Sequence, residues 1–161
     1  MAENQARPAG NWTIRPFRPP DAESILGILR NSTEAAQWPA ESYARLAALP
    51  SGIVLVSEAN AQVIGFVVAR TVADEGEILN IAVHPAFRRQ GVASALLIAV
   101  LQRLSSSAVT RIFLELRVSN LHARALYERN GFVTSGVRKA YYRDPVEDAL
   151  QMQRNLTFSS G

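Results

Sequence analysis

The hydrophobic pattern of the first third of the chain predicts one strand followed by two helices. Trp12–Phe17 is predicted as a short strand, because two prolines close it. Asp21 is a candidate N-cap for a helix that continues to Leu29, in which apolar residues recur at helical spacing. A second short helix is predicted over Pro39–Leu49, before a proline and a glycine.

The period then changes from helical to alternating. Ile53–Ser57 and Val63–Val72 are rich in β-branched residues and are separated by Glu58–Ala61, which favours a hairpin. Glu77–Val83 is predicted as a further strand, and His84-Pro85 ends it. The middle of the chain is therefore expected to supply three consecutive strands.

The second half alternates between helices and strands. Helices are predicted over Val92–Leu104 and Leu121–Asn130, and a strand, Arg111–Val118, lies between them. Phe132–Tyr142 and Asp148–Asn155 are predicted as two closing strands. This order predicts an α/β fold, a mixed central sheet of about six to seven strands flanked by about four helices.

Length and composition narrow the class of protein. The chain has 161 residues, of which 48% are hydrophobic and 19% charged, so we expect one domain over residues 12–156. Residues 1–11 and 157–161 are expected to be a flexible N-terminal segment and a C-terminal tail. The chain has no cysteine and two histidines, which disfavours disulfide scaffolds, thiolate chemistry and metal sites. Neither a secretory signal nor a membrane span is predicted, and we expect a soluble, cytoplasmic protein.

The charge pattern says little about partners. Seventeen basic residues against fourteen acidic ones give a formal net charge of +3. Arg88 and Arg89 are the only adjacent arginines, and the other basic residues are scattered. Because nucleic-acid binding needs a basic cluster or stripe, we expect no direct nucleic-acid contact.

One strand–turn–helix segment, residues 81–97, contains the strongest candidate site. A helix start exposes about four unpaired backbone N–H groups, which together attract an anion. Gly91 and Ala93 keep side-chain bulk away from that backbone, and Arg88 or Arg89 could reach a further phosphate. From spacing alone, two interpretations remain open: a pyrophosphate-binding site, and a plain strand–turn–helix connection in which glycine relieves backbone strain.

The residues of this segment resemble a known family. Arg88-x-x-Gly91-x-Ala93 resembles the Q/R-x-x-G-x-G/A acetyl-CoA motif of the GNAT N-acetyltransferase superfamily. Further segments resemble its ribosomal-protein-alanine (RimI-type) branch: residues 114–120, residues 125–132, Tyr141-Tyr142 and residues 147–149.

The resemblance implies a GNAT fold in which two strands splay apart at the acetyl-CoA site. Backbone groups of Ile81 and Val83 would then pair with the pantetheine arm, and the turn before the long helix would hold the pyrophosphate. The cofactor-binding residues that it implies are Ile81, Ala82, Val83, Arg88, Arg89, Gln90, Gly91, Val92, Ala93, Ser94 and Asn120. No metal is implied.

Glu115 is the candidate catalytic base. Strand alternation puts Phe113, Glu115 and Arg117 on one face, so Glu115 could face solvent, pair with Arg117 or line a pocket. The family resemblance implies the third option, because this position matches the family's catalytic glutamate.

Tyr127 is the candidate acid, since a phenol is protonated at neutral pH and can donate to a departing thiolate. A core tyrosine with its hydroxyl at the rim is the alternative, and the resemblance implies the acid. Asn120 lies seven residues earlier, on the same helical face, where it could contact the cofactor or cap the helix.

The acceptor side has weaker signals. Tyr141 and Tyr142 could line the acceptor site or could be ordinary strand aromatics. The resemblance also makes Trp38 a candidate substrate-binding residue, although Trp38-Pro39 reverses the Pro-Trp order usual in the branch.

The function that the resemblance implies is acetyl transfer from acetyl-CoA to a protein N-terminal amine, namely the N-terminal alanine of a small-subunit ribosomal protein. Two alternatives stay open. One is a GNAT enzyme that acetylates a small amine such as a polyamine, amino acid or drug. The other is a module that binds coenzyme A without turnover.

Overall fold

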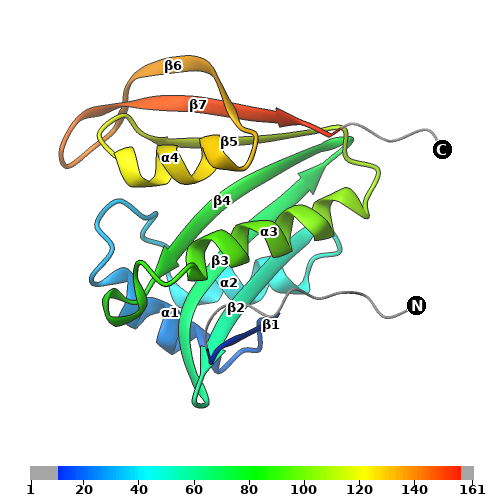
Figure 1. The fold of residues 1–161 in the computed structure, drawn as a ribbon, viewed down its shortest axis with the longest axis vertical. Coiled ribbons are helices and arrows are strands. Elements are labelled where there is room, and N and C mark those ends of the chain that lie inside the picture. Colours follow the sequence, from blue (N-terminus) through cyan, green and yellow to red (C-terminus); the bar gives the residue numbers. More distant parts are fainter. Residues whose placement is uncertain (1–10, 157–161) are drawn as a thin grey trace.

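A computed structural model describes residues 11–156 as a seven-stranded sheet with helices on both faces (Figure 1). The strand order is β1-β2-β3-β4-β5-β7-β6, and β4 with β5 is the only parallel pair. The strands are β1 (Thr13–Pro16), β2 (Gly52–Ala59), β3 (Gln62–Val72), β4 (Glu75–Val83), β5 (Arg111–Arg117), β6 (Val133–Tyr142) and β7 (Glu147–Asn155).

The helices divide between the two faces. Figure 1 shows α3 lying across the face of β2, β3 and β4, and α4 beneath the edge formed by β5, β7 and β6. The opposite face is covered by α1 and α2. The helices are α1 (Asp21–Leu29), α2 (Ala40–Ala48), α3 (Val92–Ser105) and α4 (Leu121–Arg129), with a 3-10 turn at Pro85–Phe87. The predicted α/β class and the order of elements are confirmed.

Each face of the sheet has its own apolar core. The larger core packs buried side chains of α3, among them Leu96 and Leu97, against β5 and α4. The smaller core packs Ile25 and Ile28 of α1 and Tyr43 of α2 against β2 and β3, around Phe66. Burial of these side chains is the main stabilising term, at about 1.5–3 kcal/mol for each large residue.

The hairpin predicted between the β-branched runs is present and is tighter than expected. Ala59 pairs with Gln62, so the loop has two residues, Asn60 and Ala61. Both have positive φ, 49° and 63°, as the twist of a two-residue hairpin requires.

The parallel junction of β4 and β5 is short. Residues 75–77 of β4 pair with residues 111–113 of β5, and beyond them the two strands diverge. Leu79 is an extra residue in β4, because Val68 pairs with Asn80 while Ala69 pairs with Ile78. This bulge turns both Leu79 and Asn80 toward the α1–α2 face.

One local prediction is wrong. Asp21 is the first residue of α1, and Pro20 occupies the N-cap position. The Asp21 carboxylate accepts hydrogen bonds from the Arg18 backbone N–H at 2.7 Å and from the Arg15 guanidinium at 2.8 and 2.9 Å. The Asp21 carboxylate therefore forms an ion pair with Arg15 and does not cap α1. Apart from Asn11, the predicted N-terminal segment and the C-terminal tail lie outside the described residues.

Candidate active site

The start of α3 leaves backbone donors free at an open surface. The first intrahelical bond runs from the Ala95 N–H to the Gly91 oxygen, at 3.0 Å. The N–H groups of Val92, Ala93 and Ser94 therefore have no acceptor within the helix. Gly91 has a φ of +82°, and a Cβ added to it would meet no atom within 4 Å. An anion could approach these donors closely, as the acetyl-CoA motif requires.

The edge of β4 that faces the gap is also open. The His84 N–H donates to the Ile64 oxygen at 2.7 Å, so alternate residues of β4 bond to β3. Ile81 and Val83 lie between those positions and direct their backbone groups toward the gap. Ala82 faces the α1–α2 core instead. The backbone groups of Ile81 and the N–H of Val83 therefore fit the prediction of groups available for a ligand, whereas the Val83 oxygen already accepts from Arg88 at 3.1 Å.

The arginines of the turn have different surroundings. The Arg88 guanidinium donates to the backbone oxygens of Val83 at 3.1 Å and Asn31 at 2.8 Å. Arg89 is exposed, with a φ of 62°, and Gln90 donates back to the Ala86 oxygen at 3.4 Å. Both arginines are exposed, but the Arg88 guanidinium is bound to backbone oxygens and so supports the shape of the turn.

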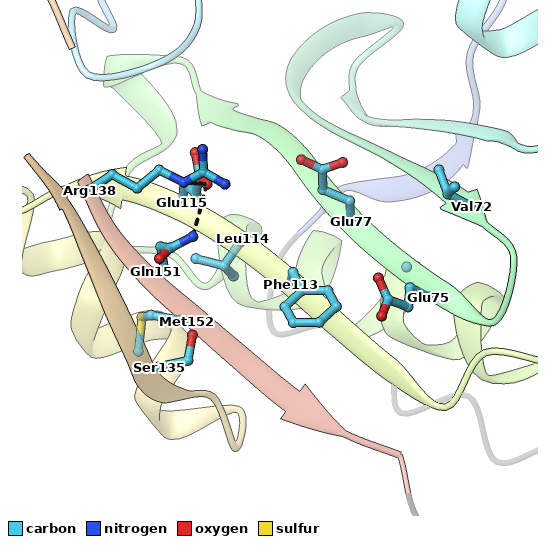
Figure 2. Close-up of a pocket in the computed structure, with 11 residues that line it drawn as sticks. Val72, Glu75, Glu77, Phe113, Leu114, Glu115, Ser135, Arg138, Gln151 and Met152 are labelled. Atoms are coloured by element: carbon cyan, nitrogen blue, oxygen red, sulfur yellow. Dashed lines mark hydrogen bonds and ion pairs between the residues drawn. The ribbon is translucent and has the colours of Figure 1, made fainter. Parts of the chain in front are cut away.

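Glu115 lies where β4 and β5 begin to diverge, two residues beyond Phe113, the last β5 residue paired with β4. Its side chain is 23% exposed and lines a pocket of about 310 Å³ on the α1–α2 side of the sheet (Figure 2). Its Oε1 forms an ion pair with Arg138, 2.9 Å from Nε, and accepts a hydrogen bond from Gln151 Nε2 at 3.4 Å. Of the three options for the Glu115 side chain, the structure agrees with the one in which it lines a pocket.

The alternative pairing of Glu115 with Arg117 is absent. Arg117 instead donates to Glu147 at 3.3 Å and to the backbone oxygens of Pro145 and Arg143 at 3.0 Å each. Its guanidinium lies 4.6 Å from the Tyr142 ring centroid. Arg117 therefore holds the β6–β7 connection.

The two adjacent tyrosines of β6 lie beside Glu115. A hydrogen bond to the Glu115 carboxylate, together with its charge, raises the pKa of the Tyr141 phenol. Burial and the charge of Glu115 raise the pKa of Tyr142 to about 12. The two rings are 5.1 Å apart, edge to face. Both tyrosines therefore lie close enough to Glu115 to feel its charge, although neither lines the pocket.

Tyr127 is buried in α4, and its ring packs edge to face against Phe132 at 5.6 Å. Burial is the main cause that raises the pKa of its phenol well above the usual value, and Tyr142 adds to the effect. The group therefore stays protonated at neutral pH. Asn120 caps α4, its side-chain oxygen accepting from the Ala123 N–H at 3.2 Å. The capping role of Asn120 is thus observed.

Trp38 is not among the residues that line the Glu115 pocket. Its ring packs against Tyr43 at 5.7 Å, and the segment before it is held by Asn80. The Asn80 amide donates to the Ala36 oxygen at 2.9 Å and accepts from the Ala36 N–H at 3.3 Å. Trp38 therefore lies on the α1–α2 connection and packs against the α1–α2 core.

Sequence reasoning missed Arg138 and Gln151, which contact the Glu115 carboxylate. Glu115 pairs across β5–β7 with Gln151, and Gln151 pairs across β7–β6 with Gly136. This register places Arg138, two residues beyond Gly136, within reach of Glu115. A Cβ on Gly136 would come within 2.8 Å of the Gln151 side-chain oxygen, which would have to move.

Two further properties concern residues 11–156. None of their helices is long and apolar enough to cross a membrane. Their His, Asp and Glu side chains form no group of three or more that could hold a metal ion.

Comparisons with known proteins agree with this geometry. Residues 22–132 match the acetyltransferase (GNAT) family. A Bacillus subtilis protein provisionally named [ribosomal protein bS18]-alanine N-acetyltransferase is 33% identical over 140 residues, which cover 86% of this chain and 92% of the relative. The [ribosomal protein bS18]-alanine N-acetyltransferase of Escherichia coli is 40% identical over 95 residues, which cover 58% of this chain and 64% of that enzyme.

Solved structures are similar over nearly the whole length. The crystal structure of the Escherichia coli ribosomal-protein-alanine N-acetyltransferase has a TM-score of 0.80 and 30% identity, covering 92% of this chain and 96% of that one. Ard1 from Thermoplasma volcanium has a TM-score of 0.84 and 31% identity, covering 92% and 100%.

The chain belongs to the GNAT acetyltransferase family. It is an N-acetyltransferase, and acetyl-CoA is the acetyl donor of the family. Within the family it is similar to the ribosomal-protein-alanine N-acetyltransferases.

Proposed function

We propose that the protein acetylates the α-amine of a protein N-terminus, and that its acceptor is the N-terminal alanine of a small-subunit ribosomal protein. The observation that carries the proposal is the position of Glu115, which lines a pocket and lies just beyond the residues where β4 and β5 pair. The names of relatives at 30–40% identity support the acceptor class.

The cosubstrate fits the residues around the gap. Val92, Ala93 and Ser94 would bind the pyrophosphate through their N–H groups, beside the open space at Gly91. Arg89 and Gln90 would lie over the phosphates, and Ile81 and Val83 would bind the pantetheine arm. Acetyl-CoA, when bound, supplies the acetyl group as an activated thioester.

Glu115 is proposed as the base. An acceptor α-amine arrives largely as an ammonium ion, which has no lone pair for attack, so a proton must leave. An α-amine with a pKa near ~7.7–8.0 loses that proton far more readily than a lysine near ~10.4. Glu115 accepts the proton, directly or through one water, and the free amine attacks the thioester carbonyl.

Tyr127 is proposed as the acid. Its phenol is held in the protonated form by burial, and it donates that proton to the departing thiolate of coenzyme A. Asn120 is proposed to help hold the cofactor near Tyr127, in addition to capping α4.

The test is mass spectrometry of acetyl-CoA reactions with peptides that differ only in their first residue. We expect a single acetyl group on the α-amine of the peptide that begins with alanine, and none on an internal lysine. A peptide with a blocked N-terminus is the matched control and should remain unmodified.

Two results would contradict the proposal. Acetylation of free polyamines, amino acids or drugs without acetylation of any peptide would indicate a small-amine GNAT enzyme. Binding of acetyl-CoA without transfer to any acceptor would indicate a binding module.

A further inference from the structure

We propose that the Arg138 guanidinium occupies the position of the acceptor ammonium, so that Arg138 competes with the acceptor for Glu115 and sets the acceptor KM. The inference rests on the proposed function, because it takes Glu115 as the group that receives the acceptor's proton. It adds a specificity-determining residue that lies on β6, outside the acetyl-CoA motif.

The first observation is the set of groups around the guanidinium. Arg138 Nε lies 2.9 Å from the Glu115 carboxylate, and its guanidinium carbon lies 5.5 Å from the Tyr141 ring centroid. Gln151 completes this end of the pocket, as Figure 2 shows. A carboxylate, an aromatic face and an amide form a binding site for a cation, whether a guanidinium or an ammonium.

The second observation is that Arg138 and Gln151 contact the same oxygen of the Glu115 carboxylate. Glu115 Oε1 is paired with the Arg138 guanidinium and accepts a hydrogen bond from Gln151. An acceptor ammonium that approached the same oxygen would meet a positive charge already in place. Because the positive charges of the guanidinium and the ammonium repel each other, the guanidinium must leave this oxygen before the ammonium can deliver its proton to it.

The third observation is that Arg138 is free to leave. Its side chain is 55% exposed, and exposed ion pairs are weak in water. The β6–β7 register shifts between Arg138 and Tyr142, so Arg138 lies at the start of an irregular part of β6. A swing toward solvent would expose Glu115 without disturbing either core.

The test compares Arg138→Gln with the wild type in steady-state assays on an alanine-initiated peptide. Removing the competing cation should lower the acceptor KM about two- to fivefold, the size of effect that an exposed ion pair supports. The KM for acetyl-CoA should not change, and kcat should not fall. An acceptor KM that rises or stays the same would overturn the inference.

Lys139→Gln is the matched control. Lys139 is the next residue and pairs with Asp148 at 3.1 Å, with its side chain 86% exposed. The variant removes an equal charge from the same strand, away from Glu115. We expect it to leave the acceptor KM unchanged, and an equal fall in both variants would attribute the effect to net charge and overturn the inference.

A soluble guanidinium gives a second readout. Ethylguanidinium added to Arg138→Gln should inhibit competitively with the peptide and raise the apparent KM back toward the wild-type value. The wild type should be less sensitive, because its own guanidinium already occupies the position. Inhibition that is not competitive with the peptide would contradict the proposal.

Glu115→Gln separates this inference from the proposed function. If that variant keeps the wild-type kcat, Glu115 is not the base and the proposed mechanism fails. If Glu115→Gln is inactive but Arg138→Gln leaves the acceptor KM unchanged, only the competition by Arg138 is overturned.

Discussion

The Arg88 guanidinium, in the turn before α3, donates to the backbone oxygen of Asn31, just after α1, over 2.8 Å. The same side chain donates to the Val83 oxygen at the end of β4 over 3.1 Å. A single residue of the acetyl-CoA motif therefore joins the last residue of β4 to the α1–α2 connection, which carries Trp38.

Arg88→Gln tests this connection. Loss of the guanidinium leaves two backbone oxygens without their donor, which should reduce the free energy of unfolding by about 1–2 kcal/mol. The KM for acetyl-CoA should also rise, because the turn loses its support. Thermal denaturation and steady-state kinetics measure the two effects.

Arg89→Gln is the comparison. Its side chain is exposed and should affect only the KM for acetyl-CoA, with the melting temperature unchanged. Equal melting temperatures for Arg88→Gln and the wild type would show that the connection contributes nothing to stability.

Tyr127→Phe should retain the fold, because the ring still packs against Phe132. If Tyr127 is the acid, kcat should fall about 10²–10⁴-fold, while calorimetry shows unchanged acetyl-CoA affinity. Tyr43→Phe, which alters a buried tyrosine of the other core, should keep the wild-type kcat. A Tyr127→Phe enzyme with full activity would remove the phenol from the mechanism.

The pH dependence follows from the raised pKa of Tyr127. A phenol whose pKa is raised keeps its proton to higher pH than a free tyrosine, whose pKa is about 10. Wild-type kcat should therefore show no alkaline loss from this group below about pH 10. A decrease near neutral pH that disappears in Tyr127→Phe would contradict this assignment.

Gly91→Ala tests the open surface at the start of α3. The left-handed φ of +82° makes alanine strained there, by about 1–2 kcal/mol, and its methyl would project into the space proposed for the pyrophosphate. Stability should fall and the KM for acetyl-CoA should rise. Gly27→Ala is the control, because a Cβ in that turn of α1 meets nothing within 4 Å, and it should stabilise the protein by about 0.5–1 kcal/mol.

Asp21→Asn tests the ion pair between Asp21 and Arg15. Burial alone would raise the pKa of Asp21, but hydrogen bonds from Arg15 and Arg18 hold it below its usual value. A lowered pKa means that the carboxylate stabilises the fold above its unfolded pKa near ~3.9, and that this contribution is lost as the pH falls through the folded pKa.

Urea denaturation should show Asp21→Asn less stable than the wild type by about 1–3 kcal/mol at pH 7. The difference should narrow as the pH falls below about 4. A difference that is constant over this range would mean that the carboxylate charge is not its cause.

The order of elements could be predicted because each local pattern agrees with the fold. β-branched alternation marked β2 and β3, and the alternation of β5 correctly put Glu115 on the face opposite Leu114 and Leu116. The acetyl-CoA motif likewise located the start of α3, because Gly91 of the motif adopts the left-handed backbone conformation that precedes the helix.

Contacts that depend on register could not be predicted. The approach of Arg138 to Glu115 requires two strand pairings and an irregularity in β6, none of which leaves a mark in the local sequence. The bulge at Leu79 is visible only in the pairing of β4 with β3. The ion pair between Arg117 and Glu147 was missed for the same reason, since the partner lies on a different strand.

The short junction between β4 and β5 links the amount of this enzyme in the cell to its cosubstrate. A cosubstrate bound along the open edge of β4 would make hydrogen bonds that the polypeptide leaves unmade, much as a missing strand would. At a hundred times its dissociation constant, such a ligand adds about 2.7 kcal/mol to the stability of the folded chain. Cells with abundant acetyl-CoA would then lose less of this protein to proteolysis, so that its amount as well as its rate would follow the metabolic state.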